Sequence, residues 1–390
     1  MKVTLVRVYT CTPIAFGGGP DFFTRDSGLL CRGLQAIGVE SRAVMPGERV
    51  TSDQADLIRT NYANLESAEW WRSLHLDAVV LYAWGRPKFR KVAMAIRDAG
   101  IFLILNQDNG GLISPLAGFH GWVIDQKHLC GGGLHWLWKL CIGLSYGLFF
   151  TDPMRAAHLR CGDVIACVSP QAAAHYQKLC RWYGGKRLAE KVAVLPHAVE
   201  HHFRYNGTQK MRQIASVGRW DDLVQKRPDL LMDVIGGLVA SDDAVQVVIA
   251  GHVTDSLRSW HESLSVNTRE RVQLRGKVNR SELAEILNSS QIFYSPSAFE
   301  SFGIAAAEAL CCGCSVLAER SVSMAAFEWF VGDQSGSLSD AGATNHLTAL
   351  RDELSAWHNG KRDAEKIAKT WTERLHADKL AAKVVEMLEK

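Results

Sequence analysis

The amino-acid sequence predicts an α/β protein with two doubly wound parallel sheets. Its 390 residues are too many for one ordinary hydrophobic core and suit two domains of similar size. Short apolar runs alternate with helical stretches, which is typical of a parallel sheet covered by helices on both faces. A polar segment at 196–207 interrupts the alternation, which then begins again. We therefore expect one such sheet in each half of the chain.

The composition limits the classes of function. With 47% hydrophobic and 22% charged residues the chain is globular, and a net charge of +3 is too small to indicate nucleic-acid binding. The first ten residues alternate like a strand and lack the apolar run of a signal peptide. The ten cysteines are spread through expected strands and helices, which favours a reducing compartment. These features predict a cytoplasmic protein and leave peripheral attachment to a membrane open.

The first half contains six expected strands, each a short apolar run. Three glycines at 17–19 follow the first strand, where they either approach a ligand closely or form a plain tight turn. Trp84, Gln107 and Asp108 fall at the C-terminal ends of strands, the edge at which open α/β sheets bind ligands. The strands are expected at 3–9, 39–46, 77–85, 100–110, 163–170 and 191–203, and two of the helices at 21–37 and 88–99.

Residues 131–150 are the most apolar stretch of the chain. The stretch contains Lys139 and several glycines and is too weak a signal for a transmembrane helix. It is either a buried helix or an interfacial one, and burial in the core is the interpretation that we favour.

The second half repeats the alternation of strands and helices. Pro228 begins a helix, because the missing N–H of proline costs nothing at that position. Ser281 is expected to cap a helix that ends at Asn288. A loop and a long helix follow over 335–358, and the tail from Lys361 is helical. The strands are expected at 212–220, 246–252, 272–277, 291–296 and 314–318.

The segment 294–318 carries the clearest chemical signal. Its pattern is strand, tight loop, Ala-rich helix and strand, which is one βαβ unit. The free N–H groups at Ser301 to Ile304 would bind an anion such as a diphosphate. Glu300 and Glu308 flank this seat. Because carboxylates repel phosphate, we expect them to accept hydrogen bonds from the hydroxyls of a ribose or a sugar.

Other strand ends supply the complementary charge. Arg219 and Lys226 follow one strand of the second half, and Gly251 ends the next. A guanidinium and an ammonium at this edge would neutralise a diphosphate without a divalent metal. No Asp-x-Asp pair, the usual holder of such a metal, occurs in the sequence. We therefore expect neither a metal nor another cofactor.

The second half resembles the retaining glycosyltransferases of the GT-B fold, family four, also called glycosyl transferases group 1. The residues that carry the resemblance are 216–231, 247–252 and the run from 272 to 318. Less specific matches are the glycines at 17–19, the strand at 163–170 and the Leu-Pro-His-Ala-Val sequence at 195–199. The resemblance implies two Rossmann-like domains that face each other across a cleft.

The family's activity implies a role for each part of this chain. Residues 1–200 would bind the acceptor, residues 201–365 the nucleotide sugar, and a helix at 366–390 would pack back toward the first domain. The reaction would move a sugar from a nucleotide diphosphate sugar to a hydroxyl acceptor, either a glycan, a lipid-linked compound or a small molecule. In the family, the departing phosphate is thought to take the acceptor proton on the face where the sugar is attacked.

The resemblance also implies the roles of single residues. Arg219 and Lys226 would bind the diphosphate, Glu308 the ribose, and Glu300 would lie beside the donor sugar. Many family members place a histidine where this chain has Gln107 and Asp108, so Asp108 is the expected catalytic residue on the acceptor side. The remaining expected substrate-binding residues are Gly18, Gly19, His197, Gly218, Gly251, Val278, Ser301, Phe302, Gly303 and Ile304.

Three alternatives remain open at this stage. Glu300 could act as a covalent nucleophile, as carboxylates do in retaining glycosidases. The chain could be an epimerase or a phosphorylase with the same fold. It could also be a non-catalytic binding protein that kept the donor site and lost the acceptor site.

Overall fold

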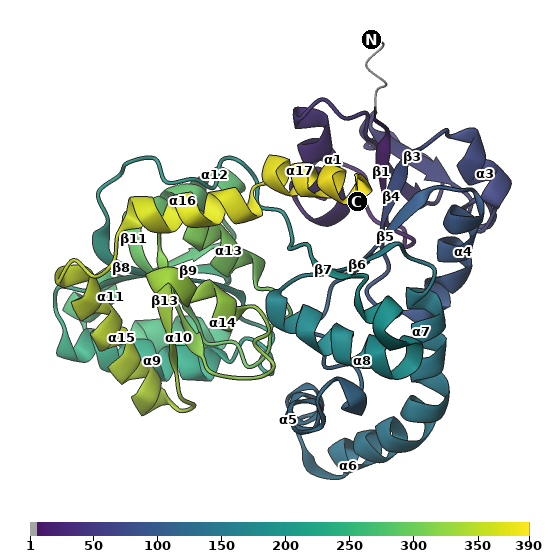
Figure 1. Cartoon of the computed structure of the whole chain (residues 1–390). Helices are drawn as coiled ribbons and strands as arrows, with labels where there is room; N and C mark the ends of the chain where they lie inside the picture. Colours follow the sequence, from purple (N-terminus) through teal and green to yellow (C-terminus); the bar gives the residue numbers. More distant parts are fainter. Residues whose placement is uncertain (1–5, 390) are drawn as a thin grey trace. The chain divides into compact units, whose positions relative to one another are not determined.

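The computed structural model describes residues 6–389, which divide into two compact α/β units (Figure 1). The first unit contains the chain up to Glu200 and again from Leu375 onward, and the second unit is His201–Arg374. Each unit has its own parallel sheet with helices on both faces, which confirms the predicted fold class.

The first unit, in its described residues, has a seven-stranded parallel sheet in the order β3-β2-β1-β4-β5-β6-β7. This is the strand order of a dinucleotide-binding fold with one strand added, and it places the chain reversal beside β1 and β4. The central strands are apolar and fully buried, as two covered faces require. The strands are β1 Val8–Cys11, β2 Ala43–Pro46, β3 Leu57–Thr60, β4 Ala78–Tyr82, β5 Phe102–Gln107, β6 Val164–Cys167 and β7 Val192–Val194.

Helices α1 and α17 join the two ends of the chain within the first unit. The main chain of α17 approaches Gly33 of α1 so closely that a Cβ there would lie 2.2 Å from the Ala377 carbonyl oxygen. The helices of this unit are η1 Pro20–Thr24, α1 Asp26–Ala36, α2 Tyr62–Leu65, α3 Ala68–Ser73, η2 Pro87–Phe89, α4 Arg90–Asp98, η3 Pro115–Ala117, α5 Phe119–Cys130, α6 Gly133–Ile142, the π-helix η4 Gly143–Thr151, α7 Asp152–Leu159, α8 Pro170–Ala189 and α17 Ala377–Leu388.

Several expected bounds in the first unit are corrected by the structure. The first strand runs from Val8 to Cys11 instead of 3–9, and residues 1–5 lie outside the described part. The helix expected at 21–37 is broken at Arg25, whose backbone is extended. Strand β3 was missed because Arg59 interrupts a run of only four residues.

The expectation of a core helix at 131–150 is wrong. Helix α6 and the π-helix η4 contain no buried residue, and Leu134 is 86% exposed. Among residues 6–389, no helix has the length and apolarity that crossing a bilayer requires.

The second unit repeats the same topology. Its described residues form a six-stranded parallel sheet in the order β10-β9-β8-β11-β12-β13. The strands are β8 Met211–Arg219, β9 Gln246–His252, β10 Val272–Gly276, β11 Ser290–Ser295, β12 Ser315–Glu319 and β13 Gly336–Ser339. The helices are α9 Pro228–Ser241, α10 Asp255–Ser263, α11 Val266–Arg271, α12 Arg280–Ser289, α13 Ile304–Cys311, α14 Phe327–Phe330, η5 Gly332–Gln334, α15 Ala343–His358 and α16 Ala364–Leu375.

Three local predictions in the second unit are corrected. Helix α12 is capped by Asn279, whose side chain accepts a hydrogen bond from the Glu282 N–H at 2.9 Å, and not by Ser281. Strand β13 lies in the segment that was read as a loop, because its sequence Gly-Ser-Leu-Ser has no apolar run. The helical tail is two helices, α16 and α17, separated by the extended residue His376.

Gly251 shows how tightly β8 and β9 approach at their C-terminal ends. Its φ is +121°, and a Cβ there would lie 1.9 Å from the Gly218 carbonyl oxygen. We expect Gly251→Ala to lower the free energy of unfolding by at least about 3 kcal/mol, because backbone strain and a steric clash act together. Urea unfolding measures this change.

Gly276→Ala is the matched control for this prediction. Gly276 also has a positive φ, of +61°, but a Cβ there would meet nothing within 4 Å. Its substitution should cost only about 1 kcal/mol. Equal costs at the two positions would contradict the close approach at Gly251.

Candidate functional site

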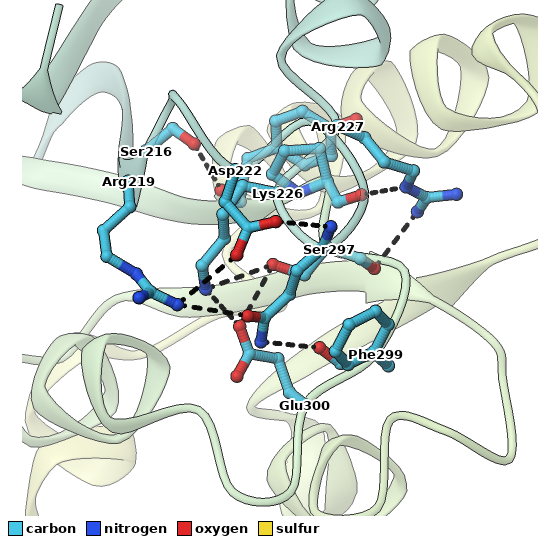
Figure 2. A network of polar contacts seen from close by, with 11 residues as sticks. Ser216, Arg219, Asp222, Lys226, Arg227, Ser297, Phe299 and Glu300 are labelled. Carbon is cyan, nitrogen blue, oxygen red and sulfur yellow. Dashed lines mark hydrogen bonds and ion pairs between the residues drawn. The ribbon is translucent and has the colours of Figure 1, made fainter. Parts of the chain in front are cut away.

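The centre of the site in the second unit is an ion pair between Lys226 and Glu300 (Figure 2). Lys226 lies in the loop after β8, and Glu300 lies in the loop after the neighbouring strand β11. The Lys226 ammonium contacts the Glu300 carboxylate and lies 3.5 Å from the Ser297 Oγ. Ser297 also donates a hydrogen bond to the same carboxylate at 3.2 Å. Both charged side chains are mostly buried, with 17% and 14% exposed.

Two hydrogen bonds join these loops, one between main-chain groups and one from a side chain. The Ala298 N–H donates to the Gln225 carbonyl at 2.8 Å, and the Gln225 side chain donates to the Phe299 carbonyl at 3.1 Å. Asp222 closes its own loop by accepting from the Gln225 N–H at 3.0 Å. The Lys226 ammonium is therefore held in place by a rigid scaffold.

Arg219 lies at the rim of this site and is 71% exposed. Its guanidinium is 3.4 Å from Asp222 and 3.3 Å from the Gln225 side-chain oxygen (Figure 2). A surface cavity of about 500 Å³ adjoins it, lined by Arg219 and by residues 221–224. Such weak, exposed contacts leave the guanidinium able to turn toward a ligand.

Arg227 supports the same loops, and the sequence analysis did not identify it. The Arg227 backbone has a positive φ of +44°. The guanidinium donates hydrogen bonds to the carbonyls of Pro296 and Ser297. It also forms an ion pair of 2.8 Å with Glu319. Burial raises the pKa of Glu319, but His346 and Arg227 together leave that pKa below its usual value. The partner carboxylate is 92 residues away, so no local motif indicates this pair.

The start of α13 lies next to Glu300. Gly303, with φ +86°, occupies the N-cap, where a Cβ would lie 2.8 Å from the Phe327 ring. The Phe302 ring is buried against Phe330, so Phe302 offers a ligand only its main chain. Ser301 and Ile304 are partly exposed. The Glu300 main chain is fixed by hydrogen bonds with Ser323 and Ala325.

Glu308 has a different partner from Glu300. Glu308 is 2% exposed, and its carboxylate lies 2.8 Å from the Arg280 guanidinium at the start of α12. The Arg280 guanidinium in turn covers the ring of Phe203 at 4.6 Å. Val278, two residues before Arg280, is partly exposed. Arg280 was missed because an Asn-Arg-Ser sequence at a helix start looks like ordinary capping.

Gly218 and Gly251 are required by packing at the strand ends. A Cβ on Gly218 would lie 3.0 Å from the buried ring of Trp220, and Gly251 touches the Gly218 carbonyl. Both glycines therefore allow the ends of β8 and β9 to pack closely. This packing requires glycine at both positions whether or not a ligand is bound.

In the first unit, His197 lies between two carboxylates. The Asp108 carboxylate is 2.8 Å from its Nε2 atom, and the Asp26 carboxylate is 3.6 Å from its Nδ1 atom. His197 is 2% exposed. Burial by itself lowers the pKa of His197, but the two carboxylates, Asp108 foremost, raise it to about 9. At neutral pH this group is an imidazolium that pairs with Asp108.

Gln107 belongs to the core of the first unit. It is fully buried, and its side-chain oxygen accepts from the Tyr176 hydroxyl at 3.1 Å. Asn109 donates to the same hydroxyl at 2.9 Å. Asp108, the next residue, keeps a partly exposed side chain, at 25%.

The glycine-rich loop borders a cavity of about 470 Å³ that is also lined by Thr12, Trp84 and Asp26. Gly17 and Gly19 line this cavity. Gly18 instead packs against Leu57 and Asp53, because a Cβ there would lie within 2.2 Å of both side chains. A packing requirement thus accounts for this glycine.

The second unit is similar to a known protein family. The family model for glycosyl transferases group 1 matches residues 199–374, which include Arg219, Lys226, Glu300 and Glu308. The match covers the whole of the second unit, His201–Arg374. Comparison with curated protein sequences gives no match.

Several solved structures share the fold over nearly the whole chain. HepE of Anabaena, in complex with UDP and glucose, is 14% identical with a TM-score of 0.60, covering 98% of this chain and 99% of that one. The lipopolysaccharide outer core galactosyltransferase WaaB is 13% identical with a TM-score of 0.64 and the same coverage. A putative UDP-N-acetylglucosamine 2-epimerase of Listeria monocytogenes is 12% identical with a TM-score of 0.60, covering 99% of this chain and 96% of that one. These likenesses establish the GT-B class of fold.

The charged state of His197 predicts how stability depends on pH. Its pKa is raised above the ordinary value of 6.5, so its stabilising contribution is fully present below pH 6.5 and is lost as the pH rises through about 9. Tyr82 nearby stays neutral over this range, because burial and the same two carboxylates raise its pKa. The loss should be roughly 3 kcal/mol.

Urea unfolding of the wild type and of His197→Gln at pH 7 and pH 10 measures this loss. The stability difference between the two proteins should be large at pH 7 and should shrink at pH 10. A difference that stays constant with pH would show that His197 is neutral in the native state.

Proposed function

We propose that this chain is a retaining glycosyltransferase that moves a sugar from a nucleoside diphosphate sugar to a hydroxyl acceptor. The observation that carries the proposal is the buried Lys226–Glu300 pair beside the start of α13, within the range that matches glycosyl transferases group 1. HepE has been solved in complex with UDP and glucose and in complex with UDP-glucose. UDP-sugars are therefore the first donors to test.

Lys226 is the residue that we expect to contribute most to the rate. In the reaction, the bond between the anomeric carbon and the diphosphate oxygen breaks, and the acceptor oxygen bonds to that carbon on the same face. The acceptor proton moves to the departing phosphate. Negative charge grows on the leaving diphosphate, and a preorganised ammonium in a mostly buried site stabilises it. Arg219, which is exposed and weakly held, would close on the diphosphate from the rim.

Glu300 is better suited to orienting the donor sugar than to attacking it. Its carboxylate is contacted by the Lys226 ammonium and by the Ser297 hydroxyl. Both contacts withdraw electron density from the oxygen that a nucleophile would use. A glycosyl adduct on Glu300, detected by mass spectrometry after a trapped turnover, would decide for the covalent mechanism instead.

Glu308 and Arg280 form the part of the donor site that we assign to the ribose. A ribose hydroxyl can donate a hydrogen bond to the Glu308 carboxylate, while the Arg280 guanidinium balances the negative charge of that buried group. Val278 would lie by the nucleobase. Its partly exposed position before α12 is compatible with that role.

We assign the acceptor hydroxyl to the first unit, with Asp108 as its contact. Asp108 is held by the His197 imidazolium and remains partly exposed. His197 is then a positioning residue, since it is buried behind that carboxylate. The acceptor class that we favour is lipid-linked, because apolar side chains of α6 and η4 are exposed in the same unit. The ten free thiols favour a cytoplasmic location.

Two measurements test the proposed function. A thermal-shift screen with UDP, GDP and ADP sugars should show stabilisation by one nucleotide class, because a ligand of the native state stabilises it by mass action. Incubation with the matching donor should then release nucleoside diphosphate, and NMR of the product should show the donor's anomeric configuration. An altered sugar without release would identify an epimerase, and binding without any turnover would identify a non-catalytic protein.

Lys226→Ala should lower turnover by about two to three orders of magnitude, because one preorganised charge donor is lost. The exposed residue Lys361 supplies the control, since Lys361→Ala removes a surface ammonium of the same unit. Steady-state rates with both variants measure the effect, and their melting temperatures check folding. Turnover that is unchanged in Lys226→Ala would remove the diphosphate assignment.

Transfer should also proceed without a divalent metal, because Arg219 and Lys226 supply positive charge to the diphosphate. We expect EDTA to leave the rate of nucleoside diphosphate release unchanged. A rate that falls with EDTA and returns with Mg²⁺ or Mn²⁺ would overturn this expectation.

A further inference from the structure

The first unit exposes an unusual amount of apolar surface on one helical segment. We call residues 119–151, which comprise α5, α6 and the π-helix η4, the apolar insert. In Figure 1, α5 and α6 project from the first unit on the side of α8. Exposed apolar surface on this scale is rare in monomeric soluble proteins. Its exposed large apolar residues are Phe119, Leu129, Leu134, Leu137, Trp138, Leu144, Tyr146, Phe149 and Phe150.

The exposure is built into a folded structure. The ring of Trp122 is buried against Gly143, where a Cβ would lie 2.3 Å from it. The Trp136 indole N–H donates to the Val123 carbonyl at 3.2 Å and ties α6 to α5. The Tyr183 hydroxyl of α8 donates to the Leu148 carbonyl at 2.8 Å and ties η4 to the body of the unit. The apolar side chains therefore point outward from fixed helices.

The outward side chains are of the types that occupy a membrane interface. Leu134 and Phe149 are 86% and 74% exposed, and Trp138 is 64% exposed. The rings of Tyr146 and Phe150 stack with centroids 5.1 Å apart, so they form one exposed aromatic pair. Amphipathic aromatic rings prefer the headgroup region, where one end is apolar and the other is hydrated.

The charge of the same surface suits an anionic partner. Within 119–151 the sequence has one carboxylate residue, Asp125, and two lysines, Lys127 and Lys139. Neither lysine makes an ion pair with any residue among those described. Exposed lysines on an apolar surface extend their ammonium groups to the lipid headgroups while the carbon chains stay in apolar contact.

Helix α8 adds charge next to η4. Trp182 is 69% exposed and adjoins Tyr183, the residue that contacts η4. Lys178, Arg181 and Trp182 line a cavity of about 580 Å³ on α8, next to Leu116 of η3. A hollow with two cations and an indole is suited to the anionic headgroup of a lipid.

We propose that the apolar insert docks on the surface of a bilayer that contains anionic lipids, with α6 and η4 lying in the headgroup region. None of the insert's helices has the length and apolarity to cross a bilayer, so the segment lies on the membrane. Charge complementarity favours this occupant over a second copy of the chain, because two copies would bring Lys127 and Lys139 against like charges. The docking does not depend on glycosyl transfer, so its failure would leave the proposed function standing.

Sedimentation with lipid vesicles tests the proposal on the full-length protein. The wild type should bind vesicles of phosphatidylcholine and phosphatidylglycerol and bind pure phosphatidylcholine vesicles much more weakly. A triple variant, Leu134→Ser, Trp138→Ser and Phe149→Ser, should bind at least about a hundredfold more weakly, because three large apolar side chains no longer enter the interface. The three positions are exposed, so the melting temperature should not change.

Two further variants separate apolar insertion from general effects. The matched control is a second triple variant, Val50→Ser, Tyr62→Ser and Val266→Ser. These exposed apolar residues lie outside the insert, so vesicle binding should be retained. Lys127→Glu with Lys139→Glu should weaken binding to the anionic vesicles by more than about tenfold, at roughly fivefold for each lysine removed.

A fluorescent label reports where the insert goes. Cys141 of α6 is exposed, and Cys130→Ser removes the other thiol that is not buried. An environment-sensitive dye on Cys141 should shift to the blue with anionic vesicles. Wild-type protein that binds vesicles of no lipid composition would overturn the proposal. So would a dye whose emission shifts only under conditions in which gel filtration shows self-association.

Discussion

The contact between Lys226 and Glu300 depends on the order of strands in the second sheet. The two residues are 74 positions apart in the sequence. They meet because β8 and β11 are hydrogen-bonded neighbours in parallel register, so the loops at their C-terminal ends leave the sheet side by side. A side chain also joins the two strands, because the buried Ser216 hydroxyl of β8 donates a hydrogen bond to the Tyr294 carbonyl of β11 at 2.7 Å. Parallel pairing thus brings a cation and a carboxylate to the place where α13 begins.

The charged side chains of this site are mostly buried, and each lies beside a side chain of opposite charge. Lys226 has Glu300, Arg227 has Glu319, and Glu308 has Arg280. A buried charge without a partner would cost several kcal/mol, so each pair is a condition for the fold. Under the proposed function, a donor diphosphate would compete with Glu300 for the Lys226 ammonium, so donor binding would change the position of that carboxylate.

The two units share an architecture but carry different charged groups after their strands. In the first unit the strand end carries Asp108, which is paired with the buried imidazolium of His197, and in the second it carries Lys226. The apolar insert is a further difference, since it interrupts the βα alternation between β5 and β6 of the first sheet. Its exposed face is not needed to cover that sheet and is therefore free for another role.

Much of the fold follows from the sequence, because buried parallel strands read as short apolar runs and βα units recur with a regular spacing. Strands β4, β5, β9 and β11 and the helix after Pro228 could be located in this way. Strands β3 and β13 could not, because Arg59 in β3 and the Gly-Ser-Leu-Ser sequence of β13 leave no apolar run at these sheet edges. The apolar run at 131–150 indicated a helix, but apolarity alone could not say whether that helix was buried.

The sequence by itself located the charged residues of the candidate donor site, since Arg219, Lys226, Glu300 and Glu308 fall at or after strand ends and near a helix start. Only the tertiary structure decided their partners. Glu300 contacts Lys226, Glu308 contacts Arg280, and His197 lies between Asp26 and Asp108. The physical reason is that local pattern fixes the strands and helices, whereas the partner of a buried charge depends on strand order and on packing between segments far apart in the chain.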